Sequence, residues 1–309
     1  MPAIVTLTMN PSLDAAAHVA RVIADAKLRI SAPSFDPGGG GINVSRVVAR
    51  LGIASVTVFP AGGRTGEELC DLLAHDRLDV RPIAIGGTTR SNLTVSETAT
   101  DQQYRFVEPG PELAQHEREA CLDAVRSVDA EWVVASGSLP PGVPDTFYAD
   151  LARRLDHAGD RLIVDTAGAA LRALGGGPGV FLIKPNVGEL QELCGHELHD
   201  RDLERAAHEL VDAGVARVVL LSLGAGGAYL ASQDVGEHLR APLVPIVSRV
   251  GAGDSMVAGV VTALAAGETL IDAARYGLAA GAAAVTTPGT ELARREDVEQ
   301  LSQRLGVDA

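Results

Sequence analysis

Short apolar runs alternate with longer amphipathic stretches through most of this 309-residue chain. From Trp132 onward these runs are Trp132–Ala135, Leu162–Val164, Val180–Ile183 and Val218–Leu221. Apolar runs of this length, separated by stretches with helical periodicity, are typical of buried parallel strands joined by crossover helices. The spacing therefore predicts an α/β fold with a doubly wound sheet.

The first part of the chain fits the same arrangement. It adds two predicted strands, Ile4–Leu7 and Val56–Pro60, and a helix over Ile42–Leu51 that Gly52 ends. Thr65-Gly-Glu-Glu68 has the pattern of a capping box at the start of another helix. Since 46% of the residues are apolar and only 3% are aromatic, we expect an aliphatic core. No linker-like stretch interrupts the chain, so we expect one domain over residues 1–309.

Two segments lack the alternation, at about residues 12–35 and 88–107. They carry short alternating pieces, such as Gln103–Val107, and no convincing helix. Both lie beside a run of four glycines, Gly38–Gly41, or beside the arginines Arg90 and Arg105. We therefore predict that the two segments form a small separate sheet, which acts as a lid over a substrate.

Charge and cysteine content narrow the function. A formal net charge of −14 argues against a nucleic-acid or anionic-membrane partner, because both require a basic protein surface. Cys70, Cys121 and Cys194 are isolated, as expected in a reducing compartment. The sequence has neither a signal-peptide pattern nor a membrane-spanning stretch, so we expect a cytoplasmic protein.

The segment Val250-Gly-Ala-Gly-Asp254 precedes an apolar helix predicted over Ser255–Ala266. Its two glycines allow a tight loop that leaves unpaired N–H groups, at the positive end of the helix, aimed at an anion. A carboxylate among such groups is suited to take a proton from a substrate hydroxyl. The pattern thus predicts a phosphoryl-transfer site whose catalytic residues are Gly251, Ala252, Gly253 and Asp254.

The glycine run Gly38–Gly41 precedes a predicted helix that carries Asn43. Without side chains, glycines let a polyhydroxyl ligand lie against backbone amides, and Asn43 can then bond its hydroxyls. By themselves the glycines fit a flexible loop better. The P-loop, G-x-G-x-x-G, G-x-S-x-G and H-E-x-x-H patterns do not occur, which excludes P-loop kinases, Rossmann dehydrogenases, α/β-hydrolases and zincins.

Several polar turns follow predicted strands. Ser138 lies in a proline-stiffened turn at a carboxyl strand end, where α/β sheets bind ligands. Asn186 and Glu189 have the spacing of a helix N-cap with its capping box, and spacing alone favours that interpretation. Ser222–Gly227 has the composition of a hairpin turn, and the small residues of Ala279–Ala284 permit either close helix packing or the approach of a flat ring.

The chain as a whole resembles the PfkB branch of the ribokinase-like sugar kinases. The matching segments, in chain order, are Thr6–Asp14, Pro37–Asn43, Phe59–Gly63, Tyr104–Phe106, Ser136–Gly142, Lys184–Glu189 and Val250–Asp254. The resemblance implies a three-layer α/β/α fold with a β-sheet lid, with ATP as co-substrate and Mg²⁺ as cofactor. It is closest to the branch that phosphorylates fructose 6-phosphate.

The resemblance also implies roles for individual residues. Those that match the sugar-binding positions of the family are Asp14, Gly38, Gly39, Asn43 and Ser138, and those that match its phosphate-binding cations are Lys27, Arg90 and Arg105. The positions that contact the nucleotide correspond to Lys184, Asn186, Ser222, Gly224, Gly227 and Ser248. Asn186 and Glu189 match the pair that organises magnesium, mostly through water.

One position departs from the family. The residue before Val250 is usually threonine or serine, whereas here it is Arg249. Relatives often hold a potassium ion beside this loop, so K⁺ is a candidate second ion. A guanidinium at this place can repel the ion, replace its charge or point to solvent, and the sequence does not choose among these.

The expected reaction is transfer of the γ-phosphoryl group of ATP to the C1 hydroxyl of fructose 6-phosphate. Gly40 stands where the 1-phosphofructokinase branch usually has lysine, which disfavours fructose 1-phosphate. Tagatose 6-phosphate remains an alternative substrate, and a sugar-phosphate or nucleotide sensor without activity is an alternative of another class. Lid strands in such proteins often pair between subunits, so we expect a homodimer in which Lys27 completes the partner's site.

Overall fold

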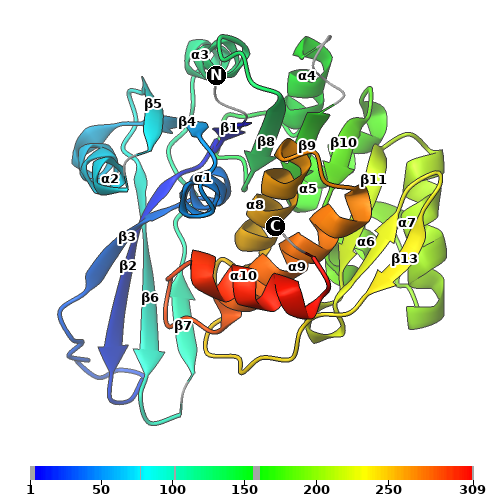
Figure 1. Cartoon of the computed structure of the whole chain (residues 1–309). Coiled ribbons are helices and arrows are strands. Elements are labelled where there is room, and N and C mark those ends of the chain that lie inside the picture. The colour runs from blue at the N-terminus through cyan, green and yellow to red at the C-terminus, as the bar shows by residue number, and fades with distance from the viewer. Residues whose placement is uncertain (1–3, 77, 101, 156–160, 308–309) are drawn as a thin grey trace.

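The structure of the protein is a computed structural model that describes residues 4–76, 78–100, 102–155 and 161–307. A large and a small sheet, with helices on both faces of the large one, make up these residues (Figure 1). The strands of the large sheet are β1 Ile4–Leu7, β4 Ser55–Ala61, β5 Asp79–Ala84, β8 Trp132–Ser136, β9 Leu162–Asp165, β10 Val180–Ile183, β11 Ala216–Ser222, β12 Ala228–Ala231 and β13 Gly236–Leu239. Those of the small sheet are β2 Ser12–Val19, β3 Ser34–Gly38, β6 Arg90–Glu97 and β7 Gln103–Phe106. The helices are α1 Gly40–Arg50, α2 Gly63–His75, α3 Gln115–Arg126, α4 Phe147–Arg154, α5 Gly168–Arg172, α6 Val187–Cys194, α7 Leu203–Asp212, α8 Ala252–Ala265, α9 Leu270–Val285 and α10 Arg295–Arg304.

The large sheet has the order β13-β12-β11-β10-β9-β8-β1-β4-β5. The strands from β11 to β5 all run parallel, and β12 and β13 extend one edge in an antiparallel hairpin. Connections between parallel neighbours pass over the faces of the sheet through helices, which is why the strands are buried on both sides. The predicted doubly wound α/β fold is confirmed.

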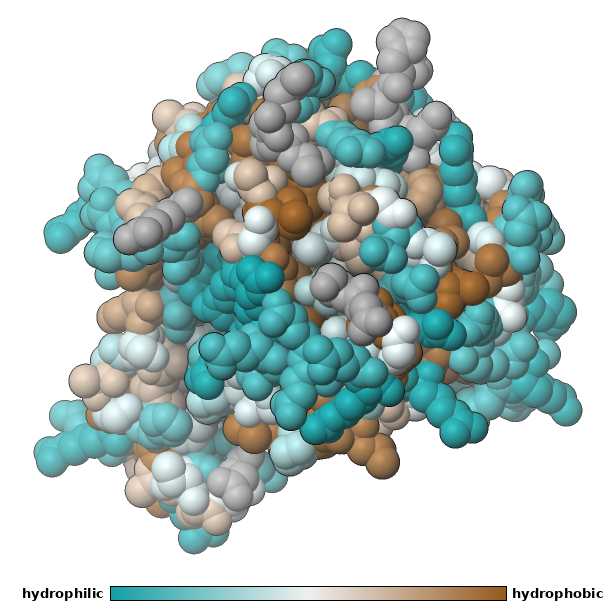
Figure 2. Space-filling view, viewed as in Figure 1, coloured by the Kyte–Doolittle hydropathy of each residue, from teal (hydrophilic) through white to brown (hydrophobic). Residues whose placement is uncertain are grey.

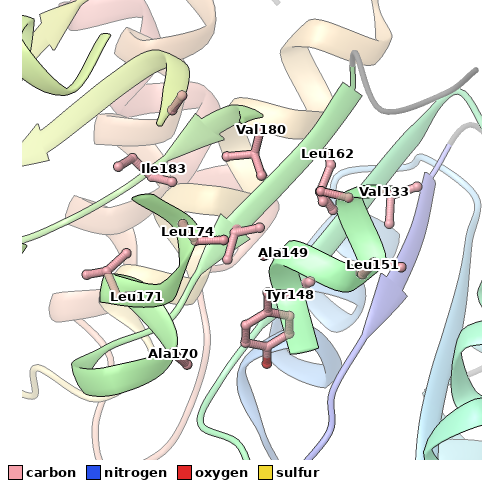
Figure 3. Close-up of a cluster of buried hydrophobic side chains, with 14 of the residues drawn as sticks. Val133, Tyr148, Ala149, Leu151, Leu162, Ala170, Leu171, Leu174, Val180 and Ile183 are labelled. Atoms are coloured by element: carbon pink, nitrogen blue, oxygen red, sulfur yellow. The ribbon is translucent and has the colours of Figure 1, made fainter. Parts of the chain in front are cut away.

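Two hydrophobic layers hold the helices to the sheet. In β8 the side chains of Val133 and Ala135 join the layer under α3 to α7, whereas Trp132 and Val134 join the layer under α1, α8, α9 and α10. Figure 3 shows part of the first layer, in which Tyr148 of α4 packs near the strands. Each fully buried aliphatic or aromatic side chain contributes about 1.5–3 kcal/mol, so the aliphatic composition suffices for a large core.

The small sheet, called the lid from here on, has the order β3-β2-β6-β7 and projects from the body at the lower left of Figure 1. In β2 the side chains of Leu13 and Ala17 are buried, whereas Asp14 and His18, on the opposite face, are at least partly exposed. The lid therefore has one buried face and one open face. The prediction of a separate small sheet is confirmed, and β3 extends it to Gly38, three residues beyond the expected boundary.

Two helices begin earlier than expected. Helix α8 starts at Ala252 rather than at Ser255, so Asp254 lies inside its first turn and not before it. Helix α1 starts at Gly40 rather than at Ile42, and Gly52 follows its end with a φ of 93° as predicted. In both cases glycine at the helix start hid the boundary, because glycine is a poor helix former.

The capping box predicted at Thr65–Glu68 is wrong. Helix α2 has already begun at Gly63, and its N-cap is Gly62. Instead, the Thr65 hydroxyl donates a hydrogen bond of 2.6 Å to the carbonyl of Thr89, which fixes the start of β6 against α2.

No helix within the described ranges is both long and apolar enough to cross a membrane. The three cysteines are free thiols.

Candidate active site

Parallel strands bring their carboxyl ends to one edge of the large sheet, and most of the predicted site residues lie at this edge. Asn10 and Ser138 follow β1 and β8, Asp165 ends β9, Lys184 follows β10, and Ser222 ends β11. Open α/β sheets bind their ligands in the crevice outside this edge. The fold thus gathers residues from five separate strands at one place.

Asp254 faces this crevice from the first turn of α8. The N-cap of the helix, Gly251, has a φ of 72°, and a Cβ there would lie 2.5 Å from Leu292 Cδ2, so both conformation and space require glycine. Asn43 of α1 donates a hydrogen bond of 2.8 Å from Nδ2 to Asp254 Oδ2. Two residues predicted from separate motifs therefore meet.

The environment of Asp254 makes its carboxylate more basic. Its pKa is raised to about 6, mainly because the carboxyl group is withdrawn from water and also because the charge of Asp165 is near. The hydrogen bond from Asn43 and the charge of Lys184 act in the opposite direction. Since Asp254 remains partly exposed, a substrate can reach it. A carboxylate with these properties is ionised at neutral pH and suited to act as a general base.

Lys184 places a positive charge beside the start of α8. Its Nζ lies 3.2 Å from Asp165 Oδ1, and the two side chains are only 8% and 15% exposed. Burial lowers the pKa of Lys184, but the charge and hydrogen bond of Asp165 outweigh it, so the pKa is above its usual value. A Cβ on Gly253 would lie 3.4 Å from Nζ, which places the ammonium group next to the predicted anion-binding loop.

Asp14 lies on the open face of the lid. Its Oδ1 accepts hydrogen bonds from Ser12 Oγ at 2.7 Å and from Asn92 Nδ2 at 2.8 Å. Gly38 packs against the same carboxylate, because a Cβ there would lie 2.3 Å from Asp14 Oδ2. Asp14 is also near enough to raise the pKa of Asp254, after the larger effects of burial and Asp165. The lid and α8 therefore share one site.

The glycine run is not a flexible loop: it is the end of β3 and the beginning of α1. Gly39 has a φ of 118°, and a Cβ there would lie 2.6 Å from Thr8 Cγ2. A Cβ on Gly40 would lie 2.3 Å from Ser136 Oγ. The protein's own packing thus requires glycine at these positions, and the same lack of side chains leaves the backbone accessible.

Arg90 is fixed at the base of the lid by the main chain. Its Nη2 donates to the carbonyl of Asn10 at 2.8 Å and its Nη1 to that of Glu108 at 2.9 Å. Its Nε is buried and has no partner among the described residues. Burial lowers the pKa of Arg90, and the charges of Asp14 and Glu108 oppose this effect. The guanidinium is therefore held rigidly, with an unused donor.

The other two predicted phosphate-binding cations are exposed. Arg105 of β7 pairs with Thr94 of β6, which puts it on the face of the lid that carries Asn92 and Arg90. Lys27 lies in the connection between β2 and β3, beyond the end of the lid that is remote from Ser12. Within one chain the structure therefore brings Arg90 and Arg105 to one face but does not bring Lys27 to them.

Ser138 is tied to the end of β1. Asn10 Nδ2 donates to Ser138 Oγ at 3.3 Å and to the carbonyl of Pro109 at 3.0 Å. The other side-chain atom of Asn10, Oδ1, is buried without a partner in the described part of the chain. Asn10 thus links Ser138 to Arg90: its side chain bonds Ser138, and its backbone carbonyl accepts from Arg90.

A cavity of about 320 Å³ lies on the other side of the α8 start. Four of the six residues predicted to contact a nucleotide line it, together with two residues of the anion-binding loop: Lys184, Ser222, Gly224, Gly227, Ala252 and Gly253. Gly224–Gly226 form a short 3₁₀ turn between β11 and β12, so the hairpin interpretation of this segment is confirmed.

The remainder of the cavity wall is mostly apolar. It is formed by Ala225, Ala241, Pro242, Leu243, Val244, Ile246, Met256, Leu278, Gly281, Ala282 and Val285, with the polar exception of Arg249. The small residues of α9 allow close helix packing, since Ala279 and Ala280 are fully buried against the other helices, and Ala282 lines the cavity. Such a wall suits a flat, weakly polar ring.

A larger cavity, of about 670 Å³, lies at the opposite edge of the large sheet, near Val180 and Ala216 at the amino ends of β10 and β11. None of the predicted site residues lines it. Ligands of open α/β sheets bind at the carboxyl ends, so the smaller cavity is the functional candidate.

Asn186 and Glu189 form the capping box that their spacing predicts. Asn186 Oδ1 accepts from the Glu189 N–H at 2.9 Å, and Glu189 Oε2 accepts from the Asn186 N–H at 2.8 Å. Burial raises the pKa of Glu189, while the Asn186 N–H and the charge of Lys184 lower it. Neither residue lines the cavity, and Glu189 Oε1 takes part in neither bond.

Ser248 is buried, and its hydroxyl is already engaged: Oγ donates to the carbonyl of Gly289 at 2.7 Å and accepts from the Val250 N–H at 3.2 Å. It does not line the cavity, whereas its neighbour Arg249 does. The structure therefore separates these two residues, and it gives Ser248 the role of holding the loop before α8.

Three site residues escaped the sequence analysis. Asp165 directly follows the predicted strand Leu162–Val164, and this position at a carboxyl strand end is the signal that could have identified it. Asn92 belongs to none of the matching segments, although it is the partner of Asp14 across the neighbouring strands β2 and β6. Asn10 lies within the first matching segment, but its linking role depends on contacts far away in the sequence.

Comparison with known proteins identifies the family to which this chain belongs. The profile of the pfkB family carbohydrate kinases matches residues 7–296. The ATP-dependent 6-phosphofructokinase isozyme 2 of Mycobacterium tuberculosis (strain H37Rv) is 48% identical over 303 residues, which are 97% of this chain and 89% of that protein. The protein of the same name from Escherichia coli (strain K12) is 41% identical over 97% of this chain and 98% of that protein.

Solved structures give the same result for the fold. Two crystal structures of phosphofructokinase-2 from Escherichia coli, in complex with potassium and with fructose-6-phosphate, match with TM-scores of 0.94 and 0.93. Their sequence identities are 41% and 40%, and each match covers 99% of this chain and 100% of that chain.

Proposed function

Because this chain belongs to the pfkB family of carbohydrate kinases, we propose that it phosphorylates fructose 6-phosphate at C1 with ATP, forming fructose 1,6-bisphosphate. The observation that carries this proposal is the position of Asp254. Asn43 bonds it on the side of the lid, and its neighbour Gly253 lines the cavity on the other side. A sugar hydroxyl and a nucleotide can therefore meet at one carboxylate.

In the proposed reaction Asp254 accepts the proton of the C1 hydroxyl as that oxygen attacks the γ-phosphorus of ATP. The new bond joins the C1 oxygen to phosphorus, the bond from phosphorus to the β,γ-bridging oxygen breaks, and ADP leaves with that oxygen. The N–H groups at the start of α8, from Gly251 to Asp254, and the Lys184 ammonium group stabilise the charge on the transferred group.

The lid supplies the sugar-phosphate site in this proposal. Asp14 accepts hydrogen bonds from the sugar hydroxyls, and the Asn43 amide donates to them. The backbone of Gly38 and Gly39 lies beside these two residues. Ser138 adds a further contact to a sugar hydroxyl. Arg90 and Arg105 bind the 6-phosphate, and guanidinium groups suit phosphate oxygens. The support is that Asp14 and Arg90 are fixed on one end of the lid by their own bonds.

Magnesium fits the remaining donors, and we assign it to Asn186 and Glu189 through water. No cluster of three or more His, Cys, Asp or Glu residues in the described ranges can hold a metal alone, so the ion would take most of its oxygens from phosphate and water, as Mg²⁺ commonly does. When bound, it neutralises phosphate charge. Glu189 Oε1 takes no part in the capping box and is the protein oxygen that we assign to contact the water shell of the ion.

Potassium stays a prediction for this chain, although the Escherichia coli structure was determined in complex with it. The loop that the resemblance implicates is held by Ser248, and Arg249 turns toward the nucleotide cavity. Initial rates in potassium salts, compared with equal concentrations of tetramethylammonium salts, test for the ion: activation by K⁺ alone supports a site, and equal rates reject it.

We propose a homodimer formed through the lid, in which Lys27 reaches the partner's sugar-phosphate site. The exposed apolar side chains of the lid support this proposal: Ile23, Leu28, Ile30, Phe35, Phe106 and Val107. The edge strands β3 and β7 lack a partner on their outer sides within the described chain, and edges of this kind are commonly covered. By contrast, the surface over α10 is mainly hydrophilic (Figure 2). A fully active monomer in sedimentation experiments would contradict this assembly.

A coupled assay that follows ADP tests the proposed reaction. With ATP and Mg²⁺, turnover of fructose 6-phosphate should exceed that of tagatose 6-phosphate and of fructose 1-phosphate. Preference for tagatose 6-phosphate would correct the substrate but keep the reaction class. Absence of turnover with every sugar phosphate, together with tight binding of one of them, would identify a sensor instead.

A further inference from the structure

Two cationic side chains line the nucleotide cavity, and they differ in how their charge is matched. Lys184 forms a buried salt bridge with Asp165, so part of its charge is already matched within the protein. Arg249 is exposed, and it forms neither a hydrogen bond nor an ion pair with any other described residue. Among the described residues that line this cavity, Arg249 is therefore the cation whose charge has no partner within the protein, whereas Lys184 shares its charge with Asp165.

The position of Arg249 limits which part of a ligand it can meet. It precedes the N-cap Gly251 by two residues, at the end of the cavity where α8 begins. The same end contains Lys184, whose ammonium group lies beside Gly253. The rest of the lining is mainly apolar and includes Leu278 and Ala282 of α9. A ligand with a flat base and an anionic tail would place the tail toward α8, within reach of an arginine.

The negative charge around the site favours a cation such as Arg249 next to an anionic ligand. The protein carries a formal net charge of −14, and Asp254, Asp165 and Asp14 all contribute negative charge around the site. A nucleoside triphosphate remains an anion even when it binds one Mg²⁺. Guanidinium groups bind phosphate through two parallel N–H donors, and such charged hydrogen bonds are stronger than neutral ones.

We propose that Arg249 binds the polyphosphate of the nucleotide and so supplies affinity for ATP, an inference that rests on the proposed placement of ATP in this cavity. The polyphosphate is then held from two sides, by the α8 amides with Lys184 on one and by Arg249 on the other.

Equilibrium titration of the full-length protein with ATP, in the presence of Mg²⁺, and with adenosine tests this role. Arg249→Ala should weaken ATP binding by roughly ten- to a hundredfold, the range for losing a charged hydrogen bond, and change adenosine binding less than about twofold. Arg249→Lys, which keeps the charge but not the paired donors, should fall between. In the same variants the Michaelis constant for ATP should rise more than that for fructose 6-phosphate.

Arg240→Ala is the matched control, because Arg240 is an exposed arginine nine residues earlier in the same segment that does not line the cavity. Its ATP affinity should equal that of the unaltered protein. If Arg249→Ala binds ATP as tightly as the Arg240 variant, the proposal is wrong. An equal loss for ATP and adenosine would also overturn it, since a phosphate contact cannot affect a nucleoside without phosphate.

A further variant separates this inference from the proposed function. Ala282→Leu adds bulk to the apolar wall of the cavity and should weaken ATP and adenosine binding alike, with thermal unfolding confirming that the protein remains folded. Loss of binding in this variant, combined with none in Arg249→Ala, rejects the role of Arg249 and keeps the nucleotide site. Unchanged binding in both variants rejects the site, and the inference with it.

Discussion

Asn43 Nδ2 lies 2.8 Å from Asp254 Oδ2, although 211 positions separate the two residues in the sequence. The contact joins the first turns of α1 and α8, one of which continues the lid while the other borders the nucleotide cavity. The hydrogen bond also lowers the pKa of Asp254, whereas burial and the charge of Asp165 raise that pKa. The proposed reaction centre is therefore formed by two helix starts and not by a single loop.

Asp254→Asn should reduce turnover by at least about a hundredfold, because it removes the positioned base, while ATP binding stays largely intact. Steady-state kinetics and nucleotide titration measure the two effects. Glu268→Gln alters an exposed acidic residue just beyond the far end of α8 and serves as the control. Near-normal turnover in the Asp254 variant would refute its role as base.

The pH dependence of kcat/KM should show an acidic limb with an apparent pKa of about 6, that of Asp254. The base works only when ionised, so activity should fall as the pH is lowered through this value and be constant above it until another group titrates. Rates measured from about pH 3.5 to about pH 8.5 with fructose 6-phosphate give the profile. A limb near pH 4, the range of an exposed aspartate, would contradict the environment described for Asp254.

Asn43→Ala should shift that limb above pH 6, because the Asn43 hydrogen bond lowers the pKa of Asp254 and its removal lets the pKa rise. The activity deficit of the variant should therefore be larger at pH 6 than at pH 8. Asn92→Ala is the control: it removes a hydrogen bond to Asp14 without touching Asp254, and its limb should stay in place. A uniform deficit at all pH values in Asn43→Ala would leave only a sugar-binding role.

Arg90→Ala and Arg105→Ala should both raise the Michaelis constant for fructose 6-phosphate, since a phosphate contact is similar in the ground and transition states. Only the Arg90 variant should also lose stability, by about 1–3 kcal/mol, because it leaves the carbonyls of Asn10 and Glu108 without their donors. Kinetics and denaturant unfolding of the two variants distinguish these effects. A change confined to kcat would exclude phosphate binding.

Gly40→Ala should destabilise the protein by about 1–3 kcal/mol, because the added Cβ would lie 2.3 Å from Ser136 Oγ and 3.0 Å from the Gly137 nitrogen. Gly176→Ala is the control, since a Cβ there meets nothing within 4 Å. Its stability should change by less than about 0.5 kcal/mol. Equal denaturation midpoints for the two variants would show that the start of α1 can move aside.

The sequence sufficed for the parallel strands because a buried strand appears as an unbroken apolar run, as in Val180–Ile183. It was less informative at helix starts, where Gly251 and Gly39 carry no cap signal and hide the first turn. The predicted capping box at Thr65 failed for a related reason. Its hydroxyl bonds to Thr89, a contact between distant segments that local spacing cannot reveal.

The site shows the same division. Asp254 and Asn43 were predicted from their motifs, but the motifs did not show that the two side chains touch. Asp165 was missed because a lone aspartate after a strand resembles many surface residues until Lys184 pairs with it. The sequence showed that Arg249 is unusual at its position, but only the structure showed that its side chain lines the cavity.

The residues assigned to the sugar lie between Asp14 and Ser138, whereas those assigned to the nucleotide lie from Lys184 onward. In the proposed function, acceptor and donor recognition thus fall in consecutive parts of one polypeptide, and Asp254, in the second part, acts on the substrate held by the first. Evolution can in consequence alter which carbohydrate is accepted through changes in the lid, while leaving the donor half untouched. Exchanging lids between relatives is the corresponding route for engineering.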